Sequence, residues 1–196
     1  MRLRLFCVAA ALFVFPLLSR GQGFSLEIGT GVPAIHAIVT RPYDSFDLAD
    51  KGQQGYIDNL YPAFTVSGIW RKNENWEFLG TACLTWRNYS ITQFEAFGVD
   101  PAGKPRYDLR KGHTISSDTA YSPSFTVQFR YLLAKQDFFT LYTGFGAGLS
   151  PQTDYIPLPS WTPFAVRFSG QHIYFFAEAC IGPVASLGHC GLGFRF

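Results

Sequence analysis

Apolar and polar residues alternate along eight segments of this 196-residue chain. A period of two is typical of β-strands, because successive side chains of a strand point to opposite faces. The last segment shows the pattern plainly in Leu192, Gly193, Phe194, Arg195 and Phe196. The alternation predicts eight strands, at residues 24–36, 61–72, 76–92, 122–134, 138–150, 162–169, 172–182 and 187–196.

The segments between these strands are alternately short and long. Short turns are predicted at residues 72–75, 134–137 and 170–171, and a further tight connection at 183–186. Long loops are predicted at residues 37–60, 93–121 and 151–161. Short turns at one end and long loops at the other are typical of transmembrane barrels. We therefore predict an all-β fold, an eight-stranded antiparallel up-and-down transmembrane β-barrel.

The two faces of the predicted strands differ in composition. In the segment at 122–134, Phe125, Val127, Phe129 and Tyr131 alternate with Thr126, Gln128 and Arg130. A soluble β-sandwich also alternates, so the period alone does not decide between the two folds. The second face here mixes small residues with isolated arginines and glutamates, which is typical of a narrow barrel lumen. We expect the apolar face to point outward.

The same alternation of strand faces places charged residues inside the barrel. We expect them to form ion pairs that plug the lumen, because an unpaired buried charge is costly and arginine binds carboxylates in a bidentate geometry. Arg71 and Glu77 lie symmetrically about one turn and are predicted to pair across strands. A proton relay or ion path through the same residues stays open as an alternative. The predicted lumen charge network is Glu27, Arg71, Glu77, Arg87, Arg130, Arg167, Glu178 and Arg195.

Aromatic residues gather at the predicted strand ends. Such positions favour the membrane–water interface, where an amphipathic ring contacts both media. The alternative is a set of aromatics that caps the core of a soluble barrel. The predicted membrane-interface aromatics are Trp70, Trp76, Trp86, Tyr131, Phe139 and Phe168.

The N-terminal residues have the pattern of a secretory signal peptide. A basic start, Met1 to Arg4, precedes an apolar run from Leu5 to Leu18 and a small, polar stretch. The run is shorter than the roughly 18 apolar residues that a spanning helix needs. We predict a signal peptide at residues 1–21, with cleavage at about 21–23, and a single outer-membrane β-barrel domain at residues 22–196.

Composition and cysteine count exclude several classes of partner and site. The net charge of +2 is too small to indicate a nucleic-acid partner. The predicted domain holds three cysteines, Cys83, Cys180 and Cys190, with no C-x-x-C spacing, so no metal site or thiol redox motif is predicted. Parity puts Cys180 and Cys190 on opposite strand faces, and we expect no disulfide between them.

Three stretches carry a family resemblance: Phe24–Gly31, Tyr174–Gly182 and Gly191–Phe196. With the alternation, they make the chain similar to small eight-stranded bacterial outer-membrane β-barrel proteins, in particular those of Bacteroidetes-like, Gram-negative bacteria. The resemblance implies insertion into the outer membrane, contact with its lipid and lipopolysaccharide, and termini in the periplasm. It also implies that the barrel-assembly machinery reads Phe194 and Phe196 as a C-terminal signal. It implies no single activity.

No catalytic, cofactor-binding or metal-binding residue is predicted. The His-x-Ser pattern expected of a lipid A deacylase is absent, and so is a G-x-S-x-G motif. The run from Gly144 to Gly148 precedes no helix and does not indicate a phosphate loop. We therefore expect a monomer without enzymatic activity, which has a structural role or recognises an unknown extracellular partner through its long loops.

Two alternatives from other classes stay open. One is a secreted soluble β-barrel that binds a small apolar ligand, and it requires the phenylalanine faces inside and the arginines outside. The other is a narrow outer-membrane channel that conducts small solutes. The side of the barrel on which each face lies separates the first alternative from the membrane interpretation, and single-channel conductance tests the second.

Overall fold

A computed structural model describes residues 23–33, 52–150 and 156–196 of the chain. The predicted signal peptide lies outside these described residues. Within them, no helix is long and apolar enough to cross a membrane. The described residues form the strands β1 (Phe24–Pro33), β2 (Gln53–Leu60), β3 (Ala63–Arg71), β4 (Trp76–Val99), β5 (Pro105–Lys135), β6 (Phe139–Leu149), β7 (Leu158–Ser169), β8 (Ile173–Ile181) and β9 (Ala185–Arg195).

The chain divides into two units. The first comprises Pro62–Thr85 and Ser122–Phe196 together with β1, and we call it the barrel unit. The second is described over residues 52–61 and 86–121, and we call it the ribbon unit. β4 and β5 are long enough to contribute one part to each unit.

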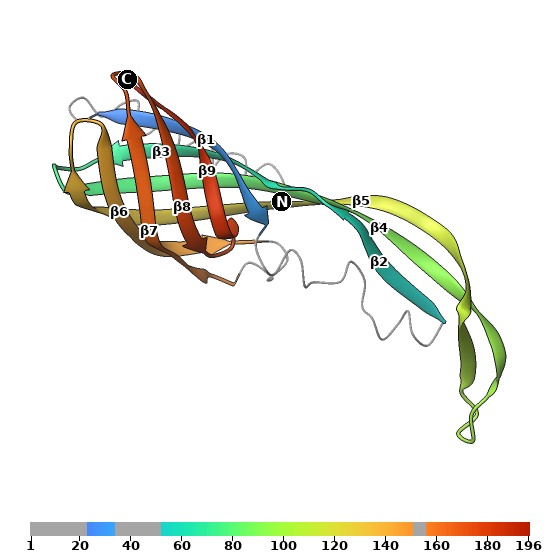
Figure 1. Cartoon of the computed structure of the whole chain (residues 1–196). Coiled ribbons are helices and arrows are strands. Elements are labelled where there is room, and N and C mark those ends of the chain that lie inside the picture. Colours follow the sequence, from blue (N-terminus) through green and yellow to red (C-terminus); the bar gives the residue numbers. More distant parts are fainter. Residues whose placement is uncertain (1–22, 34–51, 151–155) are drawn as a thin grey trace, which may run out of the picture. The chain divides into compact units, whose positions relative to one another are not determined.

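The sheet of the barrel unit closes on itself. Its strands follow the order β4-β3-β1-β9-β8-β7-β6-β5, and β5 pairs again with β4 (Figure 1). At this last seam Leu132 N donates a hydrogen bond to Asn75 O over 2.9 Å, and the rings of Trp76 and Tyr131 lie 4.9 Å apart. β1 and β9 pair antiparallel, with Ile28 opposite Leu192. The predicted eight-stranded, antiparallel, up-and-down barrel is confirmed.

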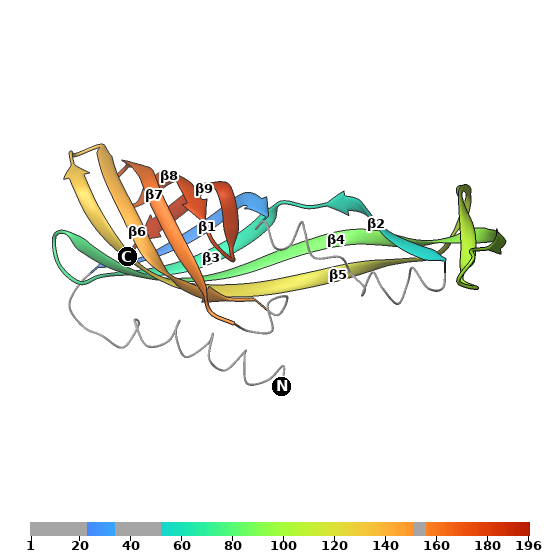
Figure 2. The ribbon, with the colours of Figure 1, turned by 90° about the horizontal axis from the view of Figure 1, so that it is seen from below.

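Side chains in the barrel unit alternate between its interior and its outer face, except where a bulge shifts the alternation of β7 between Trp161 and Phe164. Along β5, Gln128 and Arg130 are buried, whereas Phe129 between them is 47% exposed. Along β3, Thr65 and Ser67 are buried and Phe64 is 47% exposed. Figure 2 shows the strands of the barrel unit curving around its interior. Many of the side chains buried there are polar or charged. The parity read from the sequence is therefore the parity of the folded barrel.

The short turns are fixed by local side-chain chemistry. After β3, the Asn73 side-chain oxygen accepts hydrogen bonds from the backbone N–H groups of Asn75 and Trp76, each over 2.9 Å. Asparagine favours turns for this reason, since its side chain replaces a backbone acceptor. The turn brings Arg71 opposite Glu77 in the β3–β4 register, as the sequence predicts.

The ribbon unit corrects two loop predictions. Residues 93–121 were expected to form a loop, but β4 continues to Val99 and β5 begins at Pro105. Residues 37–60 were also expected to form a loop, yet Gln53–Leu60 is the strand β2, which pairs with β4. The period-two apolar signal is missing because most side chains on both faces of these strands are exposed, so neither face needs to be apolar.

A tight turn joins the two long strands. The Asp100 side chain accepts hydrogen bonds from Ala102 N and Lys104 N over 2.9 and 2.8 Å, and Gly103 has a φ of 80°. Glycine adopts this left-handed conformation without steric cost. Further along, Gly112 packs under Phe94, because a Cβ at Gly112 would lie 2.8 Å from the Phe94 ring.

Candidate functional site

Five charged side chains meet in the interior of the barrel unit. Glu27 comes from β1, Glu77 from β4, Arg130 from β5, Arg167 from β7 and Glu178 from β8. Each lies on the inward parity of its strand and is buried. Residues far apart in the sequence therefore form one cluster, which we call the lumen cluster.

Arg167 joins two of its carboxylates. Its guanidinium donates to both oxygens of Glu77, each over 3.0 Å, in the bidentate geometry that fits a carboxylate. Its Nη2 also lies 3.4 Å from Glu27 Oε1. Glu77 is held from the other side by Arg71 Nη2 at 3.0 Å, and the Arg71 side chain is 40% exposed. Arg71 therefore lies at the solvent-accessible edge of the cluster.

Arg130 joins the remaining pair. Its Nη1 donates to the two oxygens of Glu27 over 3.2 and 3.1 Å, and its Nη2 donates to Glu178 Oε1. The ion pairs thus run without interruption from Arg71 through Glu77, Arg167, Glu27 and Arg130 to Glu178. Such close pairing is what compensates for the desolvation of buried charges.

Two tyrosines complete the cluster. Tyr142 on β6 donates its hydroxyl hydrogen to Glu178 over 2.7 Å, and Tyr174 on β8 donates to Glu27 over 3.0 Å. The Arg167 guanidinium lies over both rings, 5.1 Å from the Tyr142 centroid and 4.6 Å from that of Tyr174. Cation–π contact and hydrogen bonding therefore act on the same side chains.

His189 on β9 extends the network to β3. Its Nδ1 lies 3.2 Å from Glu178 Oε2, and its Nε2 lies 2.6 Å from Thr65 Oγ1. Every strand of the barrel unit contributes at least one of these interacting residues. The sequence placed His189 on the inward face but left it, Thr65 and the two tyrosines out of the predicted network. These residues lie on the same inward strand faces as the predicted charged residues, and this alternation was the signal that could have identified them.

The other two predicted lumen arginines lie apart from the buried pairs. Arg195 Nη2 donates to Ser169 Oγ over 2.7 Å, and its guanidinium lies 5.1 Å from the Tyr174 ring centroid. Its contact with the lumen cluster is therefore through the ring of Tyr174. Arg87 is buried within the ribbon unit and is not part of the lumen cluster.

Glycines on β1 and β9 make room for the rings inside. A Cβ at Gly193 would lie 2.0 Å from Tyr174 Cζ, and a Cβ at Gly29 would lie 2.6 Å from His189 Nε2. Tyr174 and His189 occupy the space that these glycines leave at the seam. The absence of side chains at these positions lets the cluster occupy the centre of the barrel.

The predicted interface aromatics fall into two groups. The ring of Trp76 lies tilted against that of Tyr131, and the rings of Phe139 and Phe168 lie 5.8 Å apart, all within the barrel unit. Trp70 lies opposite Phe24 in the β1–β3 register. Trp86 belongs instead to the ribbon unit, where its ring lies 5.5 Å from that of Tyr61.

Cys83, Cys180 and Cys190 are free, and Cys180 is buried whereas Cys190 is exposed, so these last two occupy opposite faces as predicted. Among the described residues, no group of three or more histidine, cysteine, aspartate or glutamate side chains is arranged to hold a metal ion. The lumen cluster is thus a set of mutually neutralised charges, and its direct chemical effect is to fill the lumen and link the strands.

Comparisons with known proteins place few constraints on the chain. No protein-family model and no curated protein sequence matches it. Among solved structures, the outer membrane protein Ail of Yersinia pestis, determined in a phospholipid bilayer nanodisc, is similar over 90% of this chain and 100% of its own. The identity is 15% and the TM-score 0.44, which is too low to support a functional conclusion.

Proposed function

We propose that this chain is an integral bacterial outer-membrane β-barrel protein with periplasmic termini and no catalytic activity. In this proposal the lumen is plugged by the lumen cluster, and the role is structural or in surface recognition. The observation that carries it is the reversed polarity of the barrel unit, which has charges inside and aromatic residues outside.

The outer face supports a lipid environment. Phe145 is 55% exposed, Trp161 53% and Phe164 55%, although each is large and apolar. Removing such surface from water contributes about 25 cal/mol per Å² of apolar area. Lipid around the barrel would supply this stabilisation, whereas water would not. A soluble barrel with an apolar ligand inside needs the opposite arrangement, so the burial pattern favours the membrane proposal over that alternative.

The ribbon unit supports a role in recognition. Its exposed side chains include Phe97, Leu109, Arg110 and Lys111, so both apolar and basic groups are available to a partner. Its connecting turn at residues 100–104 is tight, so these side chains are displayed on paired strands. We propose an unidentified extracellular partner for this unit, outer-membrane lipid and lipopolysaccharide for the barrel, and recognition of Phe194 and Phe196 by the barrel-assembly machinery.

The test is to refold residues 22–196 into detergent micelles and to compare the migration of boiled and unboiled samples on a denaturing gel. A heat-dependent shift is expected, because a closed barrel resists the detergent until it is boiled. Trypsin should then leave the barrel unit intact in lipid vesicles. A protein that stays soluble without detergent and shows no shift would contradict membrane insertion and would favour the soluble ligand-binding barrel.

A conducting channel is tested separately on the same refolded protein. The interior of an eight-stranded barrel is just filled by side chains, so wild-type protein should be silent in planar bilayers. Opening of the lumen cluster by Arg130→Ala or Glu178→Ala should produce small conductances if the lumen is a closed path. Silent bilayers for both variants would rule out the conducting-channel alternative, and frequent openings of the wild type would contradict the plug.

A further inference from the structure

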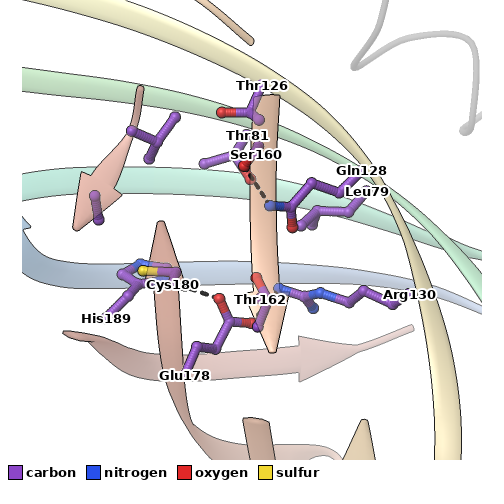
Figure 3. A pocket seen from close by; sticks show the side chains of 12 residues that line it. Leu79, Thr81, Thr126, Gln128, Arg130, Ser160, Thr162, Glu178, Cys180 and His189 are labelled. Carbon is purple, nitrogen blue, oxygen red and sulfur yellow. Dashed lines mark hydrogen bonds and ion pairs between the residues drawn. The ribbon is translucent and has the colours of Figure 1, made fainter. Parts of the chain in front are cut away.

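The barrel interior contains a cavity beside the lumen cluster. Its volume is about 30 Å³, whereas one water molecule needs roughly 10–15 Å³ by the same measure. Residues of β4, β5, β7, β8 and β9 line it, and Figure 3 shows the polar ones, including Thr126, Arg130, Thr162 and Glu178. We propose that this cavity binds one small monovalent anion, of the size of chloride, bromide or formate.

Three polar atoms of the cavity lining have no hydrogen-bond partner in the described part of the chain. They are Thr126 Oγ1, Thr162 Oγ1 and Arg130 Nε, and each belongs to a residue at most 2% exposed. Buried polar groups are nearly always hydrogen-bonded, and exceptions indicate a bound water or ion. Three such exceptions among the described residues belong to residues that line this one cavity, and each of the three atoms can donate a hydrogen.

The carboxylate oxygens beside the cavity are already engaged. Glu178 Oε1 accepts from Arg130 and Tyr142, and Glu178 Oε2 lies 3.2 Å from His189 Nδ1. Ser160 Oγ accepts from Gln128 Nε2 over 2.6 Å, which leaves the serine hydrogen available to donate. The cavity wall therefore offers hydroxyl and guanidinium hydrogens to an anion. The hydroxyl oxygens can also accept, so ordered water is the competing occupant that the tests below distinguish.

Arg130 supplies the guanidinium hydrogen of the cavity wall. Its two carboxylate partners, Glu27 and Glu178, accept from Nη1 and Nη2 and leave the Nε–H unused. Glu27, Glu77 and Glu178 are balanced by Arg71, Arg130 and Arg167, so the anion would be held by hydrogen bonds from the hydroxyls and from this Nε–H.

The proposal is tested by unfolding the detergent-refolded barrel in sodium bromide, in sodium formate and in sodium gluconate of equal ionic strength. Gluconate is too large for the cavity. The unfolding midpoint should rise in a saturable way with bromide and formate, by about 5 °C at 100 times the dissociation constant, and should not respond to gluconate. Equal midpoints in all three salts would overturn the proposal.

A matched pair of variants assigns the effect to the cavity. Thr126→Val with Thr162→Val preserves side-chain shape and removes two donors, and it should weaken bromide binding at least tenfold. Thr140→Val removes a buried hydroxyl of β6 that is not part of the cavity lining, and it should leave binding unchanged. An unchanged bromide response in the double variant would contradict the proposal.

Bromide-soaked crystals of the wild type give a direct measurement that does not depend on how the variants fold. An anomalous difference peak within hydrogen-bond distance of Thr162 Oγ1 and Arg130 Nε is expected. Ordered water in the cavity without an anomalous signal would overturn the proposal. The site lies inside the barrel, so this result is independent of membrane insertion, which the gel shift tests.

Discussion

The barrel unit and the ribbon unit share the two long strands β4 and β5, but they are stabilised differently. In the barrel unit, Arg130 of β5 is fully buried between Glu27 and Glu178. In the ribbon unit, Arg110 of the same strand is exposed. Strand pairing is common to both halves. What differs is whether the sheet closes, because closure turns one face of each strand into an interior.

The ribbon unit relies on exposed or partly buried polar pairs across its strands. Ser90 Oγ donates to Asp58 Oδ1 over 2.9 Å, and Thr119 Oγ1 donates to Asn88 Oδ1 over 3.0 Å. Each such cross-strand pair contributes roughly 0.2–1 kcal/mol. The buried ion pairs of the barrel unit are more sensitive, because the loss of one partner leaves a charge without compensation. The following predictions test this difference.

Arg130→Ala should have the largest effect. It removes the only guanidinium that contacts both Glu27 and Glu178 among the described residues, and leaves buried carboxylates underpaired. The expected loss of unfolding free energy is about 3–5 kcal/mol, measured by urea denaturation of the barrel in lipid vesicles. Arg110→Ala, at the exposed position of the same strand, should stay within about 0.5 kcal/mol of wild type. Equal losses of unfolding free energy for the two variants would contradict the proposed difference between the barrel unit and the ribbon unit.

Tyr142→Phe tests a hydrogen bond to a buried charge without changing the packing. The lost hydroxyl donates to Glu178 over 2.7 Å, so the expected cost is about 1.5–3 kcal/mol by the same denaturation measurement. The exposed Tyr121 of the ribbon unit provides the control, and Tyr121→Phe should cost close to nothing. A stable Tyr142→Phe barrel would show that Arg130 and His189 hold Glu178 without the tyrosine hydroxyl.

Gly193→Ala tests the space under the Tyr174 ring. Its Cβ would lie 2.0 Å from Tyr174 Cζ, so the ring must move and its hydrogen bond to Glu27 weakens. We expect a loss of about 1–3 kcal/mol, together with a changed tyrosine signal in near-ultraviolet circular dichroism. Gly98→Ala in the ribbon unit meets no atom within 4 Å and should be neutral or slightly stabilising. Neutral behaviour of both variants would contradict the close packing at this seam.

Asp100→Ala should have the smallest effect and should act on the ribbon unit alone. It removes the acceptor for Ala102 N and Lys104 N in the turn. Trypsin cleavage after Arg106, close to the turn, should become several-fold faster, while the unfolding midpoint of the barrel stays unchanged. Asp108→Ala offers a comparison, because Asp108 accepts only one backbone hydrogen bond, from Arg110 N, in the described part of the chain. A lower barrel midpoint in Asp100→Ala would show that the turn stabilises both units.

Much of the barrel could be predicted from the sequence because strand parity is local. The inward positions of Glu27, Arg130 and Glu178 follow from their neighbours alone, and so does the Arg71–Glu77 pair across a short turn. The ribbon strands were missed for the same reason. Between Phe94 and Tyr121 most side chains are exposed on both faces, and no apolar stripe indicates a strand.

The sequence by itself determined the strand segments of the barrel, the face of most side chains and the short turns, since these depend on neighbouring residues. The bulge in β7, which places both Thr162 and Arg167 inside, does not follow from the alternation. The tertiary structure decided which carboxylate meets which guanidinium. Glu27 and Arg130 lie 103 residues apart in the chain, and their contact depends on how the closed sheet brings β1 and β5 across the lumen. It also decided that Tyr174 fills the space above Gly193, and that a cavity with unused donors is left between β5 and β7. Closure is a property of all eight strands together, so no local pattern encodes these contacts.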